Sequence, residues 1–204
     1  MRRVVAIVEG HGEIEAVPAL VRRMAYEIAP QEIVQVESIR VPRHKLIART
    51  TSPSGQYRVN EREIGRVLSL ARSKLAHEGL VLVLVDADDD CPAELSRCLD
   101  PFLLQDGLKT IFVAAKKEFE AWFLAAAVSL RGKRGLSDSL TRPPDPEGIR
   151  GAKEWLEQNM ASGRRYSPTL DQPALAALMD MGEARSSHSF ARFYKKFRDW
   201  LVKI

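Results

Sequence analysis

Acidic residues follow closely after three apolar segments of this chain of 204 residues. Glu9 comes after the segment that ends at Val8, and Asp86 comes after the segment that ends at Val85. A third segment runs into Lys116 and then into further acidic residues. Carboxylates are the ligands that Mg²⁺ prefers in proteins, usually one or two of them with waters and substrate phosphates. The pattern therefore predicts chemistry on a phosphate group.

The acidic residues at these three places form one candidate group: Glu9, Glu13, Asp86, Asp88, Asp89, Asp90, Glu118 and Glu120. Unpaired like charges ~4 Å apart repel by about 4 kcal/mol at an effective dielectric constant of about 20, so a divalent cation is expected to offset them. The alternative is that each acid begins a helix and is stabilised by the helix dipole. That alternative explains Glu13 or Asp90 individually, but not why all three segments end in acid. Lys116 and Lys117 are predicted to assist catalysis by neutralising phosphate charge.

The apolar segments are predicted to be strands of one largely parallel sheet. The segments 4–8 and 80–85 are continuous apolar runs rich in β-branched residues, which is typical of strands buried on both faces. Strands and amphipathic helices alternate along the chain, and the carboxyl ends of parallel strands are where ligands bind in such sheets. Strands are predicted at 4–8, 33–41, 80–85 and 110–114, and helices at 14–28, 60–75, 92–104 and 118–130.

The composition changes at Arg131, where a linker rich in glycine and proline begins. Helices are predicted beyond it, at 149–160, 173–179 and 190–202. We therefore expect an α/β domain over 1–130, with a sheet flanked by helices, and a helical C-terminal extension over 131–204 that packs on it. The segment 49–55 has turn composition and is predicted to be a surface loop.

Two groups of aromatic residues invite a second interpretation. Phe119, Trp122 and Phe123 follow the third strand at helical spacing, and Phe190 and Phe193 repeat that spacing near the C-terminus. The first group could stack on nucleic-acid bases, but the strand ahead of it must also be covered by apolar side chains. We predict that both groups belong to the core.

Composition excludes several classes of protein. Hydrophobic residues make up 45% and charged residues 28%, which rules out disordered and fibrous chains. The formal charge of 31 − 27 = +4 permits a phosphate-bearing partner without demanding one. The two cysteines cannot form a disulfide framework, and the first apolar run, which Glu9 interrupts, is too short for a signal peptide. These features predict a cytoplasmic protein that does not bind membranes.

Two other known motifs are matched in part, but each lacks residues that it requires. The segment 10–12 reads Gly-His-Gly and begins like a dinucleotide-binding loop, but the third glycine is missing and Glu13 stands where a pyrophosphate would lie. The aspartates from Asp86 onward begin like a calcium loop, yet Cys91 and Arg97 occupy the positions of its glycine and glutamate. His11 remains open, either as a ligand contact or as a solvated turn residue.

The ordered set of motifs resembles the Toprim domain, the topoisomerase–primase module. Its pattern is a buried strand that runs into Glu-Gly and a later strand that runs into Asp-x-Asp, here Glu9-Gly10 and Asp86-Ala87-Asp88. With Lys-Lys-Glu-Phe-Glu-Ala-Trp-Phe-Leu at 116–124 and Ser-Phe-x-x-Phe at 189–193, the chain looks like a small Toprim-related family called domain of unknown function 4276.

The resemblance implies a role for each matching residue. Glu9 is expected to be the acid–base or metal-linked carboxylate. Asp86 and Asp88 are expected to hold Mg²⁺ or Mn²⁺, and Asp90 or Glu120 to help with a second ion. Such ions polarise a phosphoryl oxygen and orient the attacking water. The tyrosine nucleophile of Toprim topoisomerases has no recognisable counterpart here, which favours hydrolysis over strand passage.

Three functions follow as hypotheses. The first is a Toprim-like, Mg²⁺- or Mn²⁺-dependent phosphodiester hydrolase of the nuclease type, with basic residues holding nucleic acid around the acidic site. The second is a non-catalytic module that binds nucleic acid or a partner protein on a degenerate Toprim fold. The third is phosphoryl transfer on a small nucleotide. The basic residues cluster at 40–49, 131–134, 164–165 and 192–198, where they could also be merely solvated.

Overall fold

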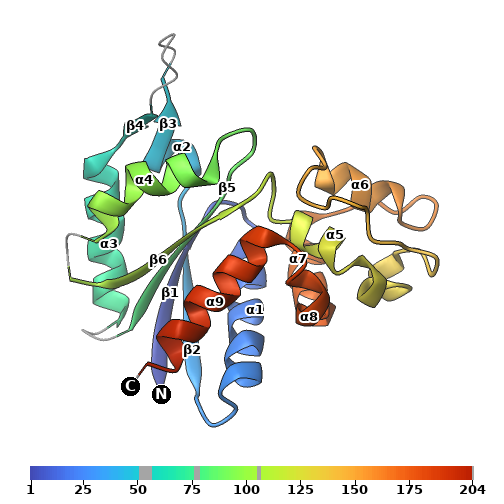
Figure 1. Cartoon of the computed structure of the whole chain (residues 1–204), viewed down its shortest axis with the longest axis horizontal. Helices are drawn as coiled ribbons and strands as arrows, with labels where there is room; N and C mark the ends of the chain where they lie inside the picture. The colour runs from blue at the N-terminus through green and yellow to red at the C-terminus, as the bar shows by residue number, and fades with distance from the viewer. Residues whose placement is uncertain (51–56, 76–78, 105–106, 204) are drawn as a thin grey trace.

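A four-stranded parallel sheet is the centre of the molecule in the computed structural model, which describes residues 1–50, 57–75, 79–104 and 107–203 (Figure 1). Its strand order is β2-β1-β5-β6. The strands are β1 (Arg2–Val8), β2 (Val34–Arg40), β5 (Leu80–Asp86) and β6 (Lys109–Ala115). This confirms the predicted α/β class with a parallel sheet, and each strand lies within two residues of its predicted bounds.

Side chains of β1 alternate between two apolar cores, one on each face of the sheet. Val4 and Val8 pack with α1 (Glu13–Ile28) and α9 (His188–Leu201), whereas Val5 and Ile7 pack with α3 and α4 on the opposite face. The latter helices are α3 (Glu61–Leu75) and α4 (Pro92–Leu103). Burial on both faces explains why the central strands are continuous apolar runs.

Short elements connect β2 to α3. The helix α2 (Arg43–Leu46) leads into β3 (Ile47–Arg49), which pairs antiparallel with β4 (Tyr57–Val59). Most of the loop predicted at 49–55 lies outside the described residues. The helix α3 begins as expected, because the side chain of Asn60 accepts a hydrogen bond from the Glu63 N–H at 3.1 Å.

The helix predicted at 118–130 is wrong as a single element. The structure has α5 (Ala121–Ala125) and a separate 3₁₀ turn, η1 (Ala127–Leu130). At the break, the Ser129 hydroxyl donates to the Ala126 carbonyl at 2.6 Å. The Ser129 N–H donates to the carboxylate of Glu183 at 3.0 Å. The bond to the distant Glu183 side chain and the bond to the carbonyl three residues earlier both favour the tighter turn over a continuous α-helix.

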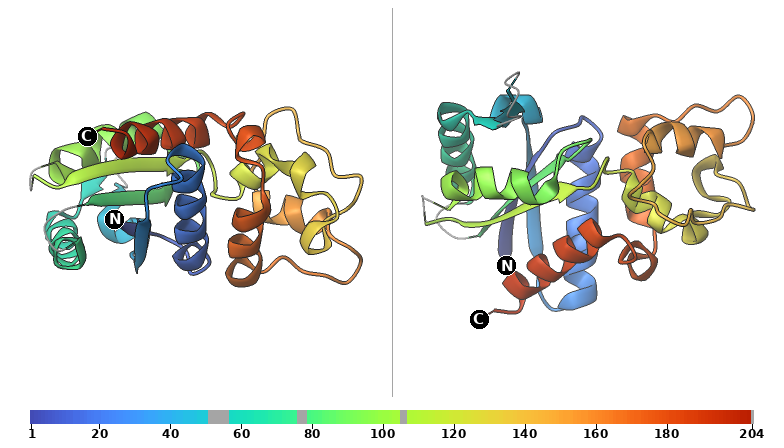
Figure 2. Two further views of the ribbon diagram at one scale, coloured as in Figure 1. Left: turned by 90° about the horizontal axis from the view of Figure 1, so that it is seen from below. Right: turned by 45° about the horizontal axis from the view of Figure 1, so that its top comes forward.

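The elements between β6 and α9 gather beyond one side of the sheet, beside α1, and β6 runs directly toward them (Figures 1 and 2). They also include η2 (Lys133–Gly135), α6 (Ala152–Gln158), α7 (Pro168–Leu178) and α8 (Met181–Ala184). The helix α7 begins earlier than predicted, because Pro168 lacks an N–H and fits the first turn of a helix. α7 packs on α1, and α9 packs on α1 and β6. The boundary at residue 131 stays a prediction.

The aromatic residues lie in the core, as predicted. Phe119, Trp122 and Phe123 are fully buried, as are Phe190 and Phe193. The Trp122 and Phe193 rings stack with centroids 5.8 Å apart. None of the helices in the described segments is long and apolar enough to cross a membrane.

Gly12 allows α7 to approach the start of α1. A Cβ atom at Gly12 would collide with the side chain of Gln172 and the carbonyl group of Pro168. We expect Gly12→Ala to lower the free energy of unfolding by about 2–3 kcal/mol, because overpacking forces a backbone to move. Urea unfolding measures this change.

Gly65→Ala in α3 is the matched control. A Cβ atom there meets no described atom within 4 Å. Alanine favours a helix over glycine by up to about 1 kcal/mol, so this variant should be as stable as the wild type or more so. Equal losses in the two variants would contradict the close approach of α7.

Candidate functional site

The carboxyl ends of β1, β5 and β6 lie at one edge of the sheet. Asp86 is the last residue of β5 and is in register with Ala115, the last residue of β6. Glu9 follows β1, the strand on the other side of β5. Parallel pairing of neighbouring strands therefore brings the predicted acidic positions to the same place.

Hydrogen bonds from backbone N–H groups connect the first three acidic residues. The Asp86 N–H donates to Glu9 Oε2 at 3.4 Å, a long hydrogen bond. The Glu9 N–H in turn donates to Glu13 Oε2 at 3.1 Å. Glu13 is the first residue of α1 and is buried, because the chain turns sharply from β1 into this helix. Glu9 therefore lies between Asp86 and Glu13.

A further hydrogen bond connects the site to the chain after β6. The Phe119 N–H donates to Asp86 Oδ1 at 2.7 Å, which places Glu120 next to the site. Glu120 is fully buried. Its Oε1 atom accepts hydrogen bonds from the Tyr166 hydroxyl at 3.1 Å and from Gln172 Nε2 at 2.7 Å. Its Oε2 atom is buried and has no hydrogen-bond partner among the described residues.

Lys153 on α6 brings a cation to these carboxylates. Its Nζ atom lies 3.4 Å from Glu118 Oε2 and 3.8 Å from Glu120 Oε2. Burial lowers the pKa of Lys153, but the nearby charges of Glu120, Asp86 and Glu118 outweigh this effect and raise the pKa overall. Lys153 could not be predicted as a member of the site, because nothing in its local sequence indicates that α6 packs against α5, which directly follows Glu120.

We call Glu9, Glu13, Asp86 and Glu120 the carboxylate cluster. The pKa of Glu13 is raised to about 7, first by burial and also by the charges of Glu120 and Glu9. Burial also raises the pKa of Asp86 well above its usual range, with added repulsion from Glu13 and Glu120. The pKa of Glu120 is raised by burial as well. The cluster therefore favours bound protons or a bound cation.

The structure places the other predicted aspartates differently. Arg43 on α2 contacts both Asp88 Oδ2 at 3.1 Å and Asp90 Oδ2 at 2.9 Å. Asp88 has a left-handed backbone (φ 49°), and its N–H donates to the Lys117 carbonyl at 2.8 Å. Lys117 Nζ lies 2.9 Å from Asp89 Oδ1. These aspartates are thus paired with cations instead of completing the cluster.

The remaining predicted residues lie near the site without joining it. Lys116 is exposed and directly follows β6. His11 is exposed in the turn between β1 and α1. Arg150, another residue that the sequence analysis missed, contacts Asp89 from the segment before α6. Asp89, Lys117 and Arg150 line a hollow of about 320 Å³ that Glu118 also borders.

The donor set of the carboxylate cluster fits a hard divalent cation. It consists of carboxylate oxygens, and the unpartnered Glu120 Oε2 has unused capacity as an acceptor. In the described part of the chain, no three His, Cys, Asp or Glu side chains form a ready group of metal ligands. Mg²⁺, however, is usually bound by one or two carboxylates, with waters and substrate phosphates completing its shell. A pair such as Glu9 and Asp86 suffices for that arrangement.

Comparison with known proteins gives one match. A family model described as "Domain of unknown function (DUF4276)" matches residues 8–198. No curated protein and no solved structure matches the chain. The matched range extends from the end of β1 to α9 and therefore includes the whole carboxylate cluster.

Proposed function

We propose that this chain, which belongs to the family Domain of unknown function (DUF4276), is a Toprim-like, divalent-metal-dependent phosphodiester hydrolase that acts on nucleic acid. The observation that carries the proposal is the crowding of four carboxylates at the carboxyl edge of the sheet. Among the described residues, Glu120 is the one member of the cluster that forms an ion pair, and its partner is Lys153. Such crowding is unfavourable for the charged carboxylates unless they bind protons or a further cation, and a divalent ion is the cation that their oxygens prefer.

Glu9 and Asp86 are the residues that would hold Mg²⁺ or Mn²⁺, with Glu13 and Glu120 adding negative charge behind them. When bound, the ion supplies polarisation of a phosphoryl oxygen and a water of lowered pKa. Lys153 holds Glu120 and offsets part of the negative charge of the cluster. Glu9 is half-buried at the turn after β1, and in this proposal it is either a ligand of the ion or the acid–base residue.

The side chains around the neighbouring hollow would orient the phosphate. Lys117 and Arg150 both contact Asp89 there, and Arg150 is largely exposed. An arginine can hold a phosphate through two parallel hydrogen bonds, so a substrate phosphate can compete with Asp89 for it. Asp89 thus keeps the two cations in position when no substrate is bound.

A non-catalytic binding module on a degenerate Toprim fold is the second candidate. It is favoured by the ion pairs of Arg43 with Asp88 and Asp90, which separate the second aspartate of the Asp-x-Asp motif from the cluster. In such a module, the affinity for nucleic acid would not change on addition of EDTA. The first candidate requires the metal for turnover.

A calorimetric titration with Mn²⁺ tests the metal site. We expect the wild type to bind Mn²⁺ and Asp86→Asn to lose that binding, because the variant removes a charged ligand from the centre of the cluster. Asp88→Asn is the matched control and should bind Mn²⁺ like the wild type. Identical binding by all three proteins would exclude the carboxylate cluster as the metal site, and loss in Asp88→Asn alone would move the site to the Asp88–Asp90 segment.

A further inference from the structure

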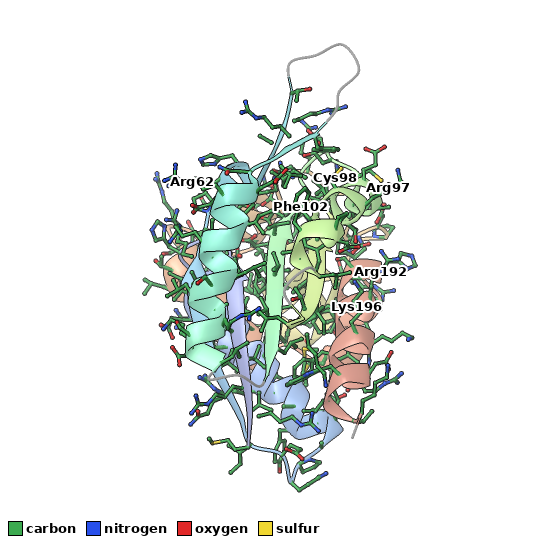
Figure 3. All side chains as sticks on the ribbon, turned by 90° about the vertical axis from the view of Figure 1, so that its left-hand side faces the viewer. Arg62, Arg97, Cys98, Phe102, Arg192 and Lys196 are labelled. Atoms are coloured by element: carbon green, nitrogen blue, oxygen red, sulfur yellow. The ribbon has the colours of Figure 1, made fainter. Side chains whose placement is uncertain are left out.

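A groove of about 450 Å³ lies along the outer edge of β6, between α4 and α9. We call it the α4–α9 groove. Its walls are the first turns of α4, the edge of β6, the part of α9 up to Lys196, and Glu147. Arg192 and Lys196 line it from α9, on the side of that helix nearest α4 (Figure 3). The groove is separate from the carboxylate cluster, since none of the four cluster residues lines it.

The charged side chains that line the groove are mostly cationic, three against one acidic. Lys116, Arg192 and Lys196 line it together with His188. The one acidic side chain in its lining, Glu147, is buried and accepts hydrogen bonds from the Ser187 hydroxyl at 2.7 Å and the Ser189 N–H at 2.8 Å. The carboxylate of Glu147 is therefore already engaged at the start of α9.

In the described part of the chain, the cations of the groove are mostly not paired with acidic side chains. Within the described residues, neither Lys116 nor Arg192 forms an ion pair, although both are exposed. Lys196 Nζ donates to the Phe112 carbonyl at 3.0 Å. Burial lowers the pKa of Lys196, Asp100 on α4 raises it, and Arg192 lowers it. Asp100 also accepts a hydrogen bond from Ser96 at 2.9 Å.

The edge of β6 and the start of α4 complete the groove. Because the Phe112 carbonyl points outward to Lys196, the alternation of a strand directs the N–H of Ala114 to the same edge. Pro92 and Ala93 contribute apolar surface from α4. The groove therefore combines cationic side chains with an apolar surface. This combination suits a nucleic-acid strand, in which charged phosphates alternate with flat apolar bases.

We propose that the α4–α9 groove binds the phosphates of a single nucleic-acid strand on its way to the carboxylate cluster. The inference rests on the proposed function and adds a binding site to it. Lys116 provides the connection: it lines the groove and is the residue after Ala115, which is in register with Asp86. A strand held by Arg192 and Lys116 would therefore lead toward the end of β5.

Fluorescence anisotropy with a labelled oligothymidylate in EDTA tests the groove without involving the metal. We expect Lys116→Ala/Arg192→Ala to weaken binding and to reduce the slope of log affinity against log salt by about 1.4, because each cation that neutralises a phosphate of a single strand adds about 0.7 to that slope. Both residues are exposed, so the fold should be unaffected. Lys195→Ala is the control on the same helix, because Lys195 pairs with Asp199 at 2.7 Å and lies outside the groove.

The outcomes separate this inference from the proposed function. The proposal that the groove binds nucleic acid would be overturned if the double variant kept the wild-type affinity and salt slope. It would also be overturned if Lys195→Ala weakened binding equally. Tighter binding of a poly-glutamate peptide than of the oligonucleotide would also overturn it, in favour of an acidic protein partner. If Asp86→Asn binds the oligonucleotide normally, while neither this variant nor the wild type cleaves it, the groove proposal stands and the hydrolase proposal fails.

Discussion

Asp86→Asn should reduce the rate of metal-dependent phosphodiester hydrolysis by more than about 100-fold. Mutation of a residue that only hydrogen-bonds to a metal ligand typically lowers metal affinity or activity by about 10–100-fold, and Asp86 is proposed to be a ligand itself. Asp86 connects the parts of the cluster. Its N–H donates to Glu9 Oε2, and its Oδ1 accepts a hydrogen bond from the Phe119 N–H. Asparagine keeps the size and one acceptor oxygen but removes the charge. The rate of bis-(p-nitrophenyl) phosphate hydrolysis in Mn²⁺ measures the effect.

Asp88→Asn is the matched comparison for this prediction. Asp88 is largely exposed and contacts Arg43, and asparagine tolerates its left-handed backbone well. We expect its rate to stay within a few-fold of the wild type. Thermal melting of both variants confirms that they are folded. A greater loss in Asp88→Asn than in Asp86→Asn would restore the Asp-x-Asp pair as the ligand set, and unchanged rates in both would favour the binding module.

The metal-free protein should become less stable as the pH rises from 5 to 8, and Glu13→Gln should remove much of this dependence. The pKa of Glu13 is raised from 4.5 to about 7 in the folded state, chiefly by burial. The folded state therefore binds this proton more tightly than the unfolded state. The resulting stabilisation is complete below the unfolded pKa and is lost as the pH rises through about 7.

The size of the effect follows from the shift. A rise from 4.5 to about 7 corresponds to about 3 kcal/mol, at about 1.4 kcal/mol per pKa unit. Asp86, whose pKa is also raised, acts in the same direction. Urea unfolding in EDTA between pH 5 and pH 8 measures the free energy of unfolding directly.

Glu15→Gln is the control for this second prediction. Glu15 lies in the first turn of the same helix but is exposed, so its variant should keep the wild-type pH profile. Mn²⁺ should restore stability to the wild type at high pH, because it binds the deprotonated carboxylates. A flat pH profile in the metal-free wild type would show that the cluster is less buried than the structure has it.

Much of the sheet and the position of the site could be predicted from the sequence. The apolar runs of β1 and β5 have a local physical cause, since a strand buried on both faces needs apolar side chains at every position. Parallel pairing then brings Glu9 and Asp86 to one edge, whatever the helices do. The spacing of Phe190 and Phe193 likewise predicted that they lie on the buried face of α9.

The membership of the site was decided by tertiary structure. Asp86 and Asp88 are two residues apart and look equivalent in sequence, yet one accepts from Phe119 while the other contacts Arg43. Lys153 reaches Glu120 only because α6 packs against α5, the helix that Glu120 precedes. Sequence spacing carries no signal for such pairs, since they depend on how distant elements pack.

The sequence by itself therefore determined an α/β protein with a parallel sheet and acidic residues at its carboxyl edge. The tertiary structure decided which of those acids are buried together, and burial is what raises the pKa of Glu13 and Asp86. It also decided where the chain after β6 breaks its helix, through the bond from Ser129 to Glu183. The physical reason is that apolar periodicity is a local property, whereas desolvation and ion pairing arise from residues that only folding brings together.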